Sequence, residues 1–275
     1  MATTFNTLEL PPSLLVGTRT IAELEDAIRG GADLVEFDCK NCSSDLRSLN
    51  DLVELAGLRA PRMGICVDVG DVRDFEASEF RPALPQGVRW ARLGLAGCRG
   101  NPNWQADWQQ IRSEINAASG RPLKWLAVAH ADADFACSPK VGEIVHLAVE
   151  SRCSGLFLET HRKSACSIAD TMTPCELTQT IWMARELRLP VFVGGAIGLG
   201  DLDWICDLEP AVVAVRSSVC DSGAVDQSVS ETRVNRFKLA LEAAAGFDRA
   251  RWDFLQQCRA RQAASATRVP ARSSH

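Results

Sequence analysis

The chain has 275 residues, of which 46% are hydrophobic and 24% charged, and its formal net charge is −5 at pH 7. These values are typical of a soluble globular protein with a sizeable core, and they exclude the basic footprint of a protein that binds nucleic acid or an anionic membrane. No apolar run approaches the ~20 residues that span a bilayer, and the N-terminus has no secretory signal pattern. The eleven cysteines are scattered, which favours free thiols in a reducing compartment. We therefore predict a cytoplasmic protein.

Short apolar runs alternate with helical patterns along the chain. The expected strands are the eight apolar runs 14–17, 34–38, 63–70, 90–97, 123–132, 155–160, 190–197 and 211–218. The expected helices are 20–31, 48–58, 103–118, 138–151, 173–189, 200–209 and 230–245. The segment after residue 70 is poorly patterned.

Three of the expected helices carry explicit start signals. In each, a hydroxyl residue precedes a proline or a glutamate at the spacing of an N-terminal cap. Gly30 and Gly31 supply a stop signal for the first helix. The start signals are Thr20 with Glu23, Ser138 with Pro139, and Thr173 with Pro174 and Glu176.

Strands that alternate with helices imply parallel pairing, and eight such units are the count of a (β/α)₈ TIM barrel. A doubly wound open sheet is the alternative, because counting runs cannot show closure. We expect an N-terminal extension at 1–13, the barrel at 14–246, and a C-terminal extension at 247–275. The extension begins as a helix and ends in a polar, small-residue segment that we expect to be disordered.

In a barrel, catalytic groups lie at the carboxyl ends of the strands. Charged residues gather at these ends, although buried parallel strands are normally apolar. A ring of mutually satisfied charges is the alternative to an active site. The residues are Glu36, Asp38, Lys40, Asp68, Asp71, Arg92, His130, Asp132, Glu159, His161, Lys163 and Arg216.

The stretch EFDCKNC at 36–42 allows a thiol, a metal or a lysine site. A redox Cys-x-x-Cys motif belongs at a helix N-terminus, whereas Cys39 and Cys42 follow a strand. A structural zinc site needs a second pair of ligands, which is not apparent, so we expect no metal. The period of two places Glu36 and Asp38 on one face with Lys40, where an amine near carboxylates can form a Schiff base.

Lysine is rare in this chain, with five lysines against twenty-five arginines. Two of the five, Lys40 and Lys163, follow expected strands two and six. Local charge favours a neutral Lys163 amine, because His161 and Arg162 precede it, whereas the carboxylates before Lys40 favour its charged form.

Loops after the last two strands of a barrel often bind phosphate through backbone N–H groups. The loops GGAIGLG and VRSSVCDSG have this composition, although glycines in a tight turn explain the first equally well. The candidate phosphate-binding residues are Gly194, Gly195, Arg216, Ser217 and Ser218.

Several stretches in this order resemble the (5-formylfuran-3-yl)methyl phosphate synthases of methanofuran biosynthesis, over about residues 14–240. They are LLVGTRTIAELEDAIRGGADLVEFDCKN, VDVGDV, WARLGLAG, HADAD, LFLETHRK and VVAVRSSVC. The resemblance implies a (β/α)₈ barrel and a carbon–oxygen lyase of one-carbon metabolism. Such a lyase condenses two glyceraldehyde 3-phosphate molecules through a lysine Schiff base, without metal or cofactor.

The resemblance also implies site residues. The family's Asp-x-Lys-Asn motif is matched by Asp38 and Lys40, and its acid and lysine on strand six by Glu159 and Lys163. Its strand-five Asp is matched by Asp132. The implied roles are imine formation by Lys40, orientation and proton transfer by Asp38 and Glu159, and a second amine at Lys163.

Three features depart from the family pattern. Lys40 lies two residues further from Gly-Gly-Ala-Asp than in the family, and an ungapped register would place Glu36 and Asp38 at the acid and lysine positions. The Glu-Gly-Ser-Leu-Gly loop is replaced by CSSDLRSL. The family's strand-four lysine is matched by Arg92, which stays protonated and is expected to grip a phosphate.

The expected partner is therefore a small phosphorylated aldehyde. The sequence leaves open whether the chain forms a homo-oligomer. The alternative is a diverged, non-catalytic barrel that binds a sugar phosphate or a protein partner in one-carbon metabolism. Another barrel lyase or isomerase with a phosphate substrate is a third option.

Overall fold

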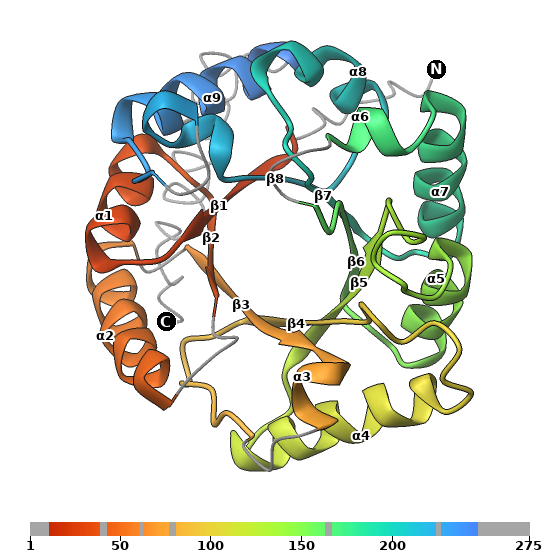
Figure 1. Ribbon diagram of the computed structural model, residues 1–275. Helices are drawn as coiled ribbons and strands as arrows, with labels where there is room; N and C mark the ends of the chain where they lie inside the picture. The colour runs from red at the N-terminus through yellow and green to blue at the C-terminus, as the bar shows by residue number, and fades with distance from the viewer. Residues whose placement is uncertain are drawn as a thin grey trace, which may run out of the picture.

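The computed structural model describes residues 11–38, 43–60, 63–76, 81–162, 167–223 and 227–246. Within these ranges the chain forms a closed barrel of eight parallel strands in sequence order. Strand β8 returns to β1, with pairs from Ser13↔Val212 to Val16↔Val215. Figure 1, along the barrel axis, shows the helices as an outer ring. The predicted (β/α)₈ barrel is confirmed. The open-sheet alternative is wrong, because the first and last strands of an open sheet do not pair, whereas β1 and β8 do.

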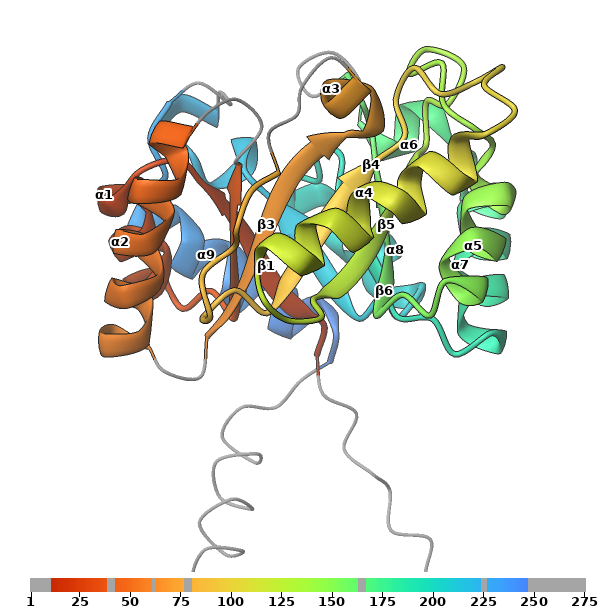
Figure 2. The ribbon, with the colours of Figure 1, turned by 90° about the horizontal axis from the view of Figure 1, so that it is seen from below.

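The elements alternate as expected, and all strands run in one direction, so their carboxyl ends meet at one end of the barrel (Figure 2). The strands are β1 (Ser13–Thr18), β2 (Leu34–Asp38), β3 (Gly64–Asp71), β4 (Trp90–Gly94), β5 (Lys124–His130), β6 (Gly155–Glu159), β7 (Val191–Val193) and β8 (Val212–Val215). The α-helices are α1 (Ile21–Gly30), α2 (Ser43–Arg59), α3 (Val72–Glu76), α4 (Trp104–Ala118), α5 (Val141–Glu150), α6 (Ile168–Thr171), α7 (Pro174–Glu186), α8 (Leu202–Asp207) and α9 (Glu231–Ala244). Short 3₁₀ turns are η1 (Leu199–Asp201), η2 (Ser217–Val219) and η3 (Asp221–Gly223).

The start and stop signals of α1 act as predicted. The hydroxyl of Thr20 accepts a hydrogen bond from the N–H of Glu23 at 3.2 Å. Gly31 ends the helix with φ +91°, a left-handed conformation that costs a glycine little. The predicted cap at Thr173 also forms, since its hydroxyl accepts from the N–H of Glu176.

The predicted start of α5 is wrong. The helix begins at Val141, not at Pro139, and the N–H of Lys140 donates to the carboxylate of Glu143 at 2.8 Å. The hydroxyl of Ser138 instead donates to the carbonyl of Pro139 at 3.1 Å. The sequence also gave no sign of α3 and α6, because helices of four or five residues are too short to show a period.

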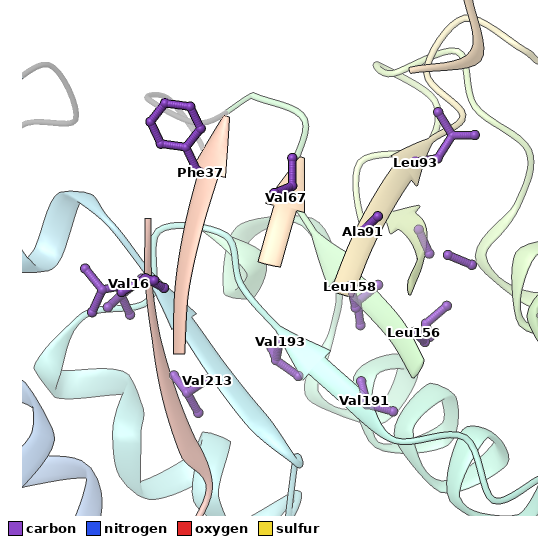
Figure 3. Packing of buried hydrophobic residues seen from close by; sticks show 14 of the residues in the cluster. Val16, Phe37, Val67, Ala91, Leu93, Leu156, Leu158, Val191, Val193 and Val213 are labelled. Carbon is purple, nitrogen blue, oxygen red and sulfur yellow. The ribbon is translucent and has the colours of Figure 1, made fainter. Parts of the chain in front are cut away.

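Two apolar layers hold the barrel. The inner layer fills the barrel interior and comes from every second residue of the strands: Leu15, Leu34, Cys66, Leu126, Val128, Phe157, Phe192, Val212 and Ala214. The outer layer comes from the alternate positions, which pack between strands and helices (Figure 3). Because strand side chains alternate, residues with the parity of the inner layer point into the barrel mouth where the strands end.

The helices and cysteines that the structure describes match two expectations from the sequence, the lack of a membrane span and the free thiols. None of the helices within the described ranges is long and apolar enough to cross a membrane. Among these same residues seven cysteines occur, and all are free thiols. Cys39, Cys42, the predicted C-terminal extension at 247–275 and residues 1–10 of the predicted N-terminal extension at 1–13 lie outside the described residues. Ser13, at the end of that predicted extension, already belongs to β1.

Gly30 permits close packing of α9 on α1. A Cβ atom at Gly30 would lie 2.5 Å from Cβ of Val234 and 2.8 Å from the carbonyl oxygen of Glu231. We expect Gly30→Ala to lower the free energy of unfolding by about 1–3 kcal/mol, because the two helices must separate. Gly57→Ala is the matched control, since a Cβ there meets no atom within 4 Å. Urea unfolding that found Gly30→Ala as stable as Gly57→Ala would contradict this packing.

Candidate active site

One arginine and three carboxylates meet inside the barrel near its mouth. Arg92 on β4 is 1% exposed. Its Nη1 donates to Glu159 on β6 at 2.7 Å, and its Nη2 donates to Asp68 on β3 at 2.6 Å and to Glu36 on β2 at 3.0 Å. Its Nε lies 2.8 Å from the second oxygen of Glu36. We call Arg92, Glu36, Asp68 and Glu159 the Arg92 cluster.

The Arg92 cluster is negatively charged overall, because three carboxylates surround one guanidinium. Burial opposes the charge of Arg92, but Asp68, Glu159 and Glu36 outweigh it and hold its pKa well above the ordinary value. The guanidinium also lies 4.5 Å from the centre of the Phe157 ring, which forms the floor of the cluster. Arg92 is therefore a permanent cation and cannot accept a proton.

A buried thiol lies beneath these charges. Burial, with the carboxylates of Glu36 and Asp68, raises the pKa of Cys66 well above its usual range, although Arg92 acts in the opposite direction. The thiol of Cys66 stays neutral at physiological pH, and a neutral thiol is a poor nucleophile. Cysteine chemistry at this point of the barrel is therefore not supported.

A cavity of about 100 Å³ opens beside the Arg92 cluster. Its walls come from β1, β2, β6 and the segments that end β7 and β8. Glu36 and Glu159 contribute one side, and the predicted phosphate-binding residues Gly194, Gly195, Arg216 and Ser217 contribute the other. The geometry thus brings two carboxylates and the predicted phosphate loops to one small space.

The loops that line this cavity present backbone donors. Gly195 and Ala196 have φ of +103° and +52°, and a Cβ at Gly195 would lie 3.1 Å from the N and Oγ1 atoms of Thr160. Within the described residues, the N–H groups of Gly195, Ala196 and Ser217 donate to no protein acceptor. Such donors suit an anion.

Two of the predicted phosphate-binding side chains have protein partners. Arg216 donates to both carboxylate oxygens of Glu23 at 3.0 and 3.1 Å, and to the carbonyl of Gly17 at 2.8 Å. Burial raises the pKa of Glu23. The hydrogen bonds from Arg216 and from the N–H of Arg19 together lower it by more, so the pKa of Glu23 lies below its ordinary value. Ser218 does not line the cavity, and its hydroxyl donates to the carbonyl of Ile197.

The other predicted catalytic residues are distributed as follows. Asp38 ends β2 and is exposed, whereas Asp132 is buried. The carboxylate of Asp132 accepts from the N–H groups of His161 and Arg162 at 2.7 and 3.1 Å, and so fixes the chain directly before Lys163. Lys40 and Lys163 themselves lie in the ranges 39–42 and 163–166, outside the described residues.

Glu36 and Asp68 belong to the site. The sequence had placed both among the charged residues at the strand ends, but it gave Glu36 a role only in the ungapped register and gave Asp68 none. Both have the inward parity of their strands, as Leu34 and Cys66 show. The alternation along each strand therefore indicated that these two acids point inward. The sequence of one strand does not reveal that its acid contacts an arginine of another strand. Across the described part of the chain, no group of three or more His, Cys, Asp or Glu residues is placed to hold a metal ion.

The fold and site define a (β/α)₈-barrel protein with polar groups and candidate anion donors at the carboxyl ends of its strands. The chain belongs to the 4-HFC-P synthase family, whose sequence pattern matches residues 14–238. This is a synthase family of methanofuran biosynthesis.

Two curated relatives illustrate the similarity. The (5-formylfuran-3-yl)methyl phosphate synthase of Methanopyrus kandleri is 24% identical over 240 residues, which is 85% of this chain and 99% of that protein. The putative (5-formylfuran-3-yl)methyl phosphate synthase of Methylorubrum extorquens is 24% identical over 245 residues, covering 87% and 95%.

Among solved structures, thiamine phosphate pyrophosphorylase from Pyrococcus furiosus has a TM-score of 0.55 and 16% identity, covering 84% of this chain and 96% of that one. Phosphoribosyl anthranilate isomerase from Thermus thermophilus has a TM-score of 0.53 and 14% identity, with 84% and 98% covered. At these identities the likeness concerns the fold.

Proposed function

We propose that this protein is a cytoplasmic lyase that condenses two glyceraldehyde 3-phosphate molecules into (5-formylfuran-3-yl)methyl phosphate through a lysine Schiff base. Membership of the synthase family supports the reaction class. The observation that carries the proposal is the cavity shared by Glu36, Glu159 and the loops after β7 and β8. It combines acid–base groups with unpaired backbone donors that suit a phosphate.

Lys40 is the proposed imine-forming residue. Its amine attacks the aldehyde carbon, and the carbinolamine loses water to form an imine, which is cationic when protonated. The net negative charge of the Arg92 cluster stabilises such a cation. Glu159 and Asp38 are proposed to orient the amine and transfer protons, and Lys163 to assist as the second amine.

Asp132 and Arg92 take positioning roles in this proposal. Asp132 holds the backbone of His161 and Arg162, directly before Lys163. The contacts of Arg92 go to three carboxylates, and these would repel a phosphate. We therefore propose that Arg92 holds the carboxylates in place, and that phosphate is held by the N–H groups of Gly195, Ala196 and Ser217.

Borohydride trapping tests the proposal. Wild-type protein is incubated with glyceraldehyde 3-phosphate and borohydride, and labelled peptides are mapped by mass spectrometry. We expect one reduced adduct on Lys40, lost in Lys40→Arg and retained in the exposed control Lys140→Arg. An adduct on Lys163 in the Lys40→Arg variant would show that Lys163 is the nucleophile.

A second candidate function is a non-catalytic barrel that binds a sugar phosphate. It is favoured by Arg92, because a guanidinium cannot serve as the proton acceptor that the family's lysine is expected to be. Calorimetric binding of glyceraldehyde 3-phosphate without adduct or product would support this function. Absence of both binding and adduct would exclude both functions.

A further inference from the structure

His130 is a buried histidine that the proposed reaction does not yet use. It is the last residue of β5 and is 3% exposed. Leu126 and Val128, which precede it at every second position, belong to the inner layer of the barrel. His130 therefore has the parity that points into the barrel mouth.

Neither ring nitrogen of His130 has a hydrogen-bond partner among the described residues. Oδ1 of Asp71 lies 3.8 Å from Nε2 of His130, which is beyond hydrogen-bond distance. A buried polar group left unpaired destabilises the folded state, and such groups in native proteins call for an explanation. A partner that arrives with a ligand is one such explanation.

The surroundings of His130 belong to the mouth of the barrel. Glu159, which lines the cavity, is its register partner on β6. The carboxylate of Asp71 on β3 fills the space where a Cβ of Gly94 would lie. Gly94 follows Arg92 by two residues on β4. The ring of His161 packs edge-on against His130 with centroids 5.1 Å apart. Among the described residues, the titratable groups that face His130 are thus Asp71, Glu159 and His161.

We propose that His130 is a catalytic proton-transfer residue of this site, acting on a bound phosphorylated aldehyde; the substrate class rests on the proposed function. A condensation that ends in an aromatic ring must lose water, and each loss needs a base and an acid. Arg92 stays protonated, whereas an imidazole can both accept and donate a proton and can serve in both roles.

The step balances without a co-reactant. A ring nitrogen of His130 takes a proton from the carbon next to the imine, and the electrons of that C–H bond form the C=C bond of an enamine. The resulting imidazolium gives the proton to the phosphate ester oxygen on the neighbouring carbon. Phosphate leaves with the electrons of its C–O bond, the enamine electrons form the new C=C bond, the nitrogen lone pair restores the imine, and the imidazole is regenerated.

The test compares His130→Asn with His146→Asn, an exposed histidine on α5. For the wild type and His146→Asn we expect equal kcat/KM and the same pH profile. For His130→Asn we expect a loss of about 100-fold or more in kcat/KM and a changed pH profile, with an unchanged melting temperature. Activity within about threefold of the wild type and an unchanged pH profile would overturn the proposal.

A second measurement separates this inference from the proposed function. The chain has four histidines, so histidine-labelled protein gives few imidazole resonances, and the His130→Asn variant assigns one of them. If the wild type makes no product, the proposed function fails, but glyceraldehyde 3-phosphate should still shift the His130 resonance. Absence of that shift, with inorganic phosphate as the reference ligand, would overturn the inference as well.

Discussion

Replacing Arg92 by methionine will lower the free energy of unfolding by about 3–5 kcal/mol at neutral pH, because it leaves buried carboxylates without their cation. Glu36, Asp68 and Glu159 all contact this guanidinium, and Arg92 is 1% exposed. The exposed Arg89, whose guanidinium lies over the Trp90 ring at 4.7 Å, is the matched control. Urea unfolding of the Arg92→Met and Arg89→Met variants measures the difference.

The loss at Arg92 should depend on pH. Without the guanidinium, burial opposes the charged form of the carboxylates, and protonation removes that cost. Protonation of these carboxylates stabilises the folded variant as the pH falls. The difference in the free energy of unfolding between the wild type and Arg92→Met should therefore shrink between about pH 7 and pH 5. A deficit below about 1 kcal/mol at pH 7, or one that grows on acidification, would contradict the cluster as described.

Replacing Glu159 by glutamine will lower kcat/KM for furan formation by about 100-fold or more, because the amide cannot take up or release the proton in the condensation. Glu159 faces the cavity and accepts from Nη1 of Arg92 at 2.7 Å. A glutamine can still accept that bond, so the contact with Arg92 remains. We therefore expect the stability to change by less than about 1 kcal/mol.

The control for Glu159 is Glu242→Gln. Glu242 is also a buried glutamate in an ion pair, 3.5 Å from Nζ of Lys238, but it lies on α9, outside the lining of the cavity. Its substitution should leave kcat/KM unchanged whatever it does to stability. If Glu159→Gln kept product formation within about threefold of the wild type, Glu159 would not be a proton-transfer group.

Much of the site's location was predictable from the sequence, because the location depends on strand ends. Period-two parity and the barrel rule placed Glu159, Arg92 and the loops after β7 and β8 at one end of the molecule. Their actual partners were not predictable. Arg92 was expected to grip a phosphate but contacts three carboxylates, and Arg216 lies against Glu23 of α1.

The sequence by itself determined the alternation of strands and helices, the boundaries of α1 and the start of α7. These follow from hydrophobic period and from caps within a few residues, such as Thr20 with Glu23 and Thr173 with Glu176. Only the tertiary structure decided barrel closure, the Arg92 cluster and the unpaired imidazole of His130. Each depends on which inward side chains of different strands come within about 3–4 Å, and that distance depends on register and barrel curvature rather than on local sequence.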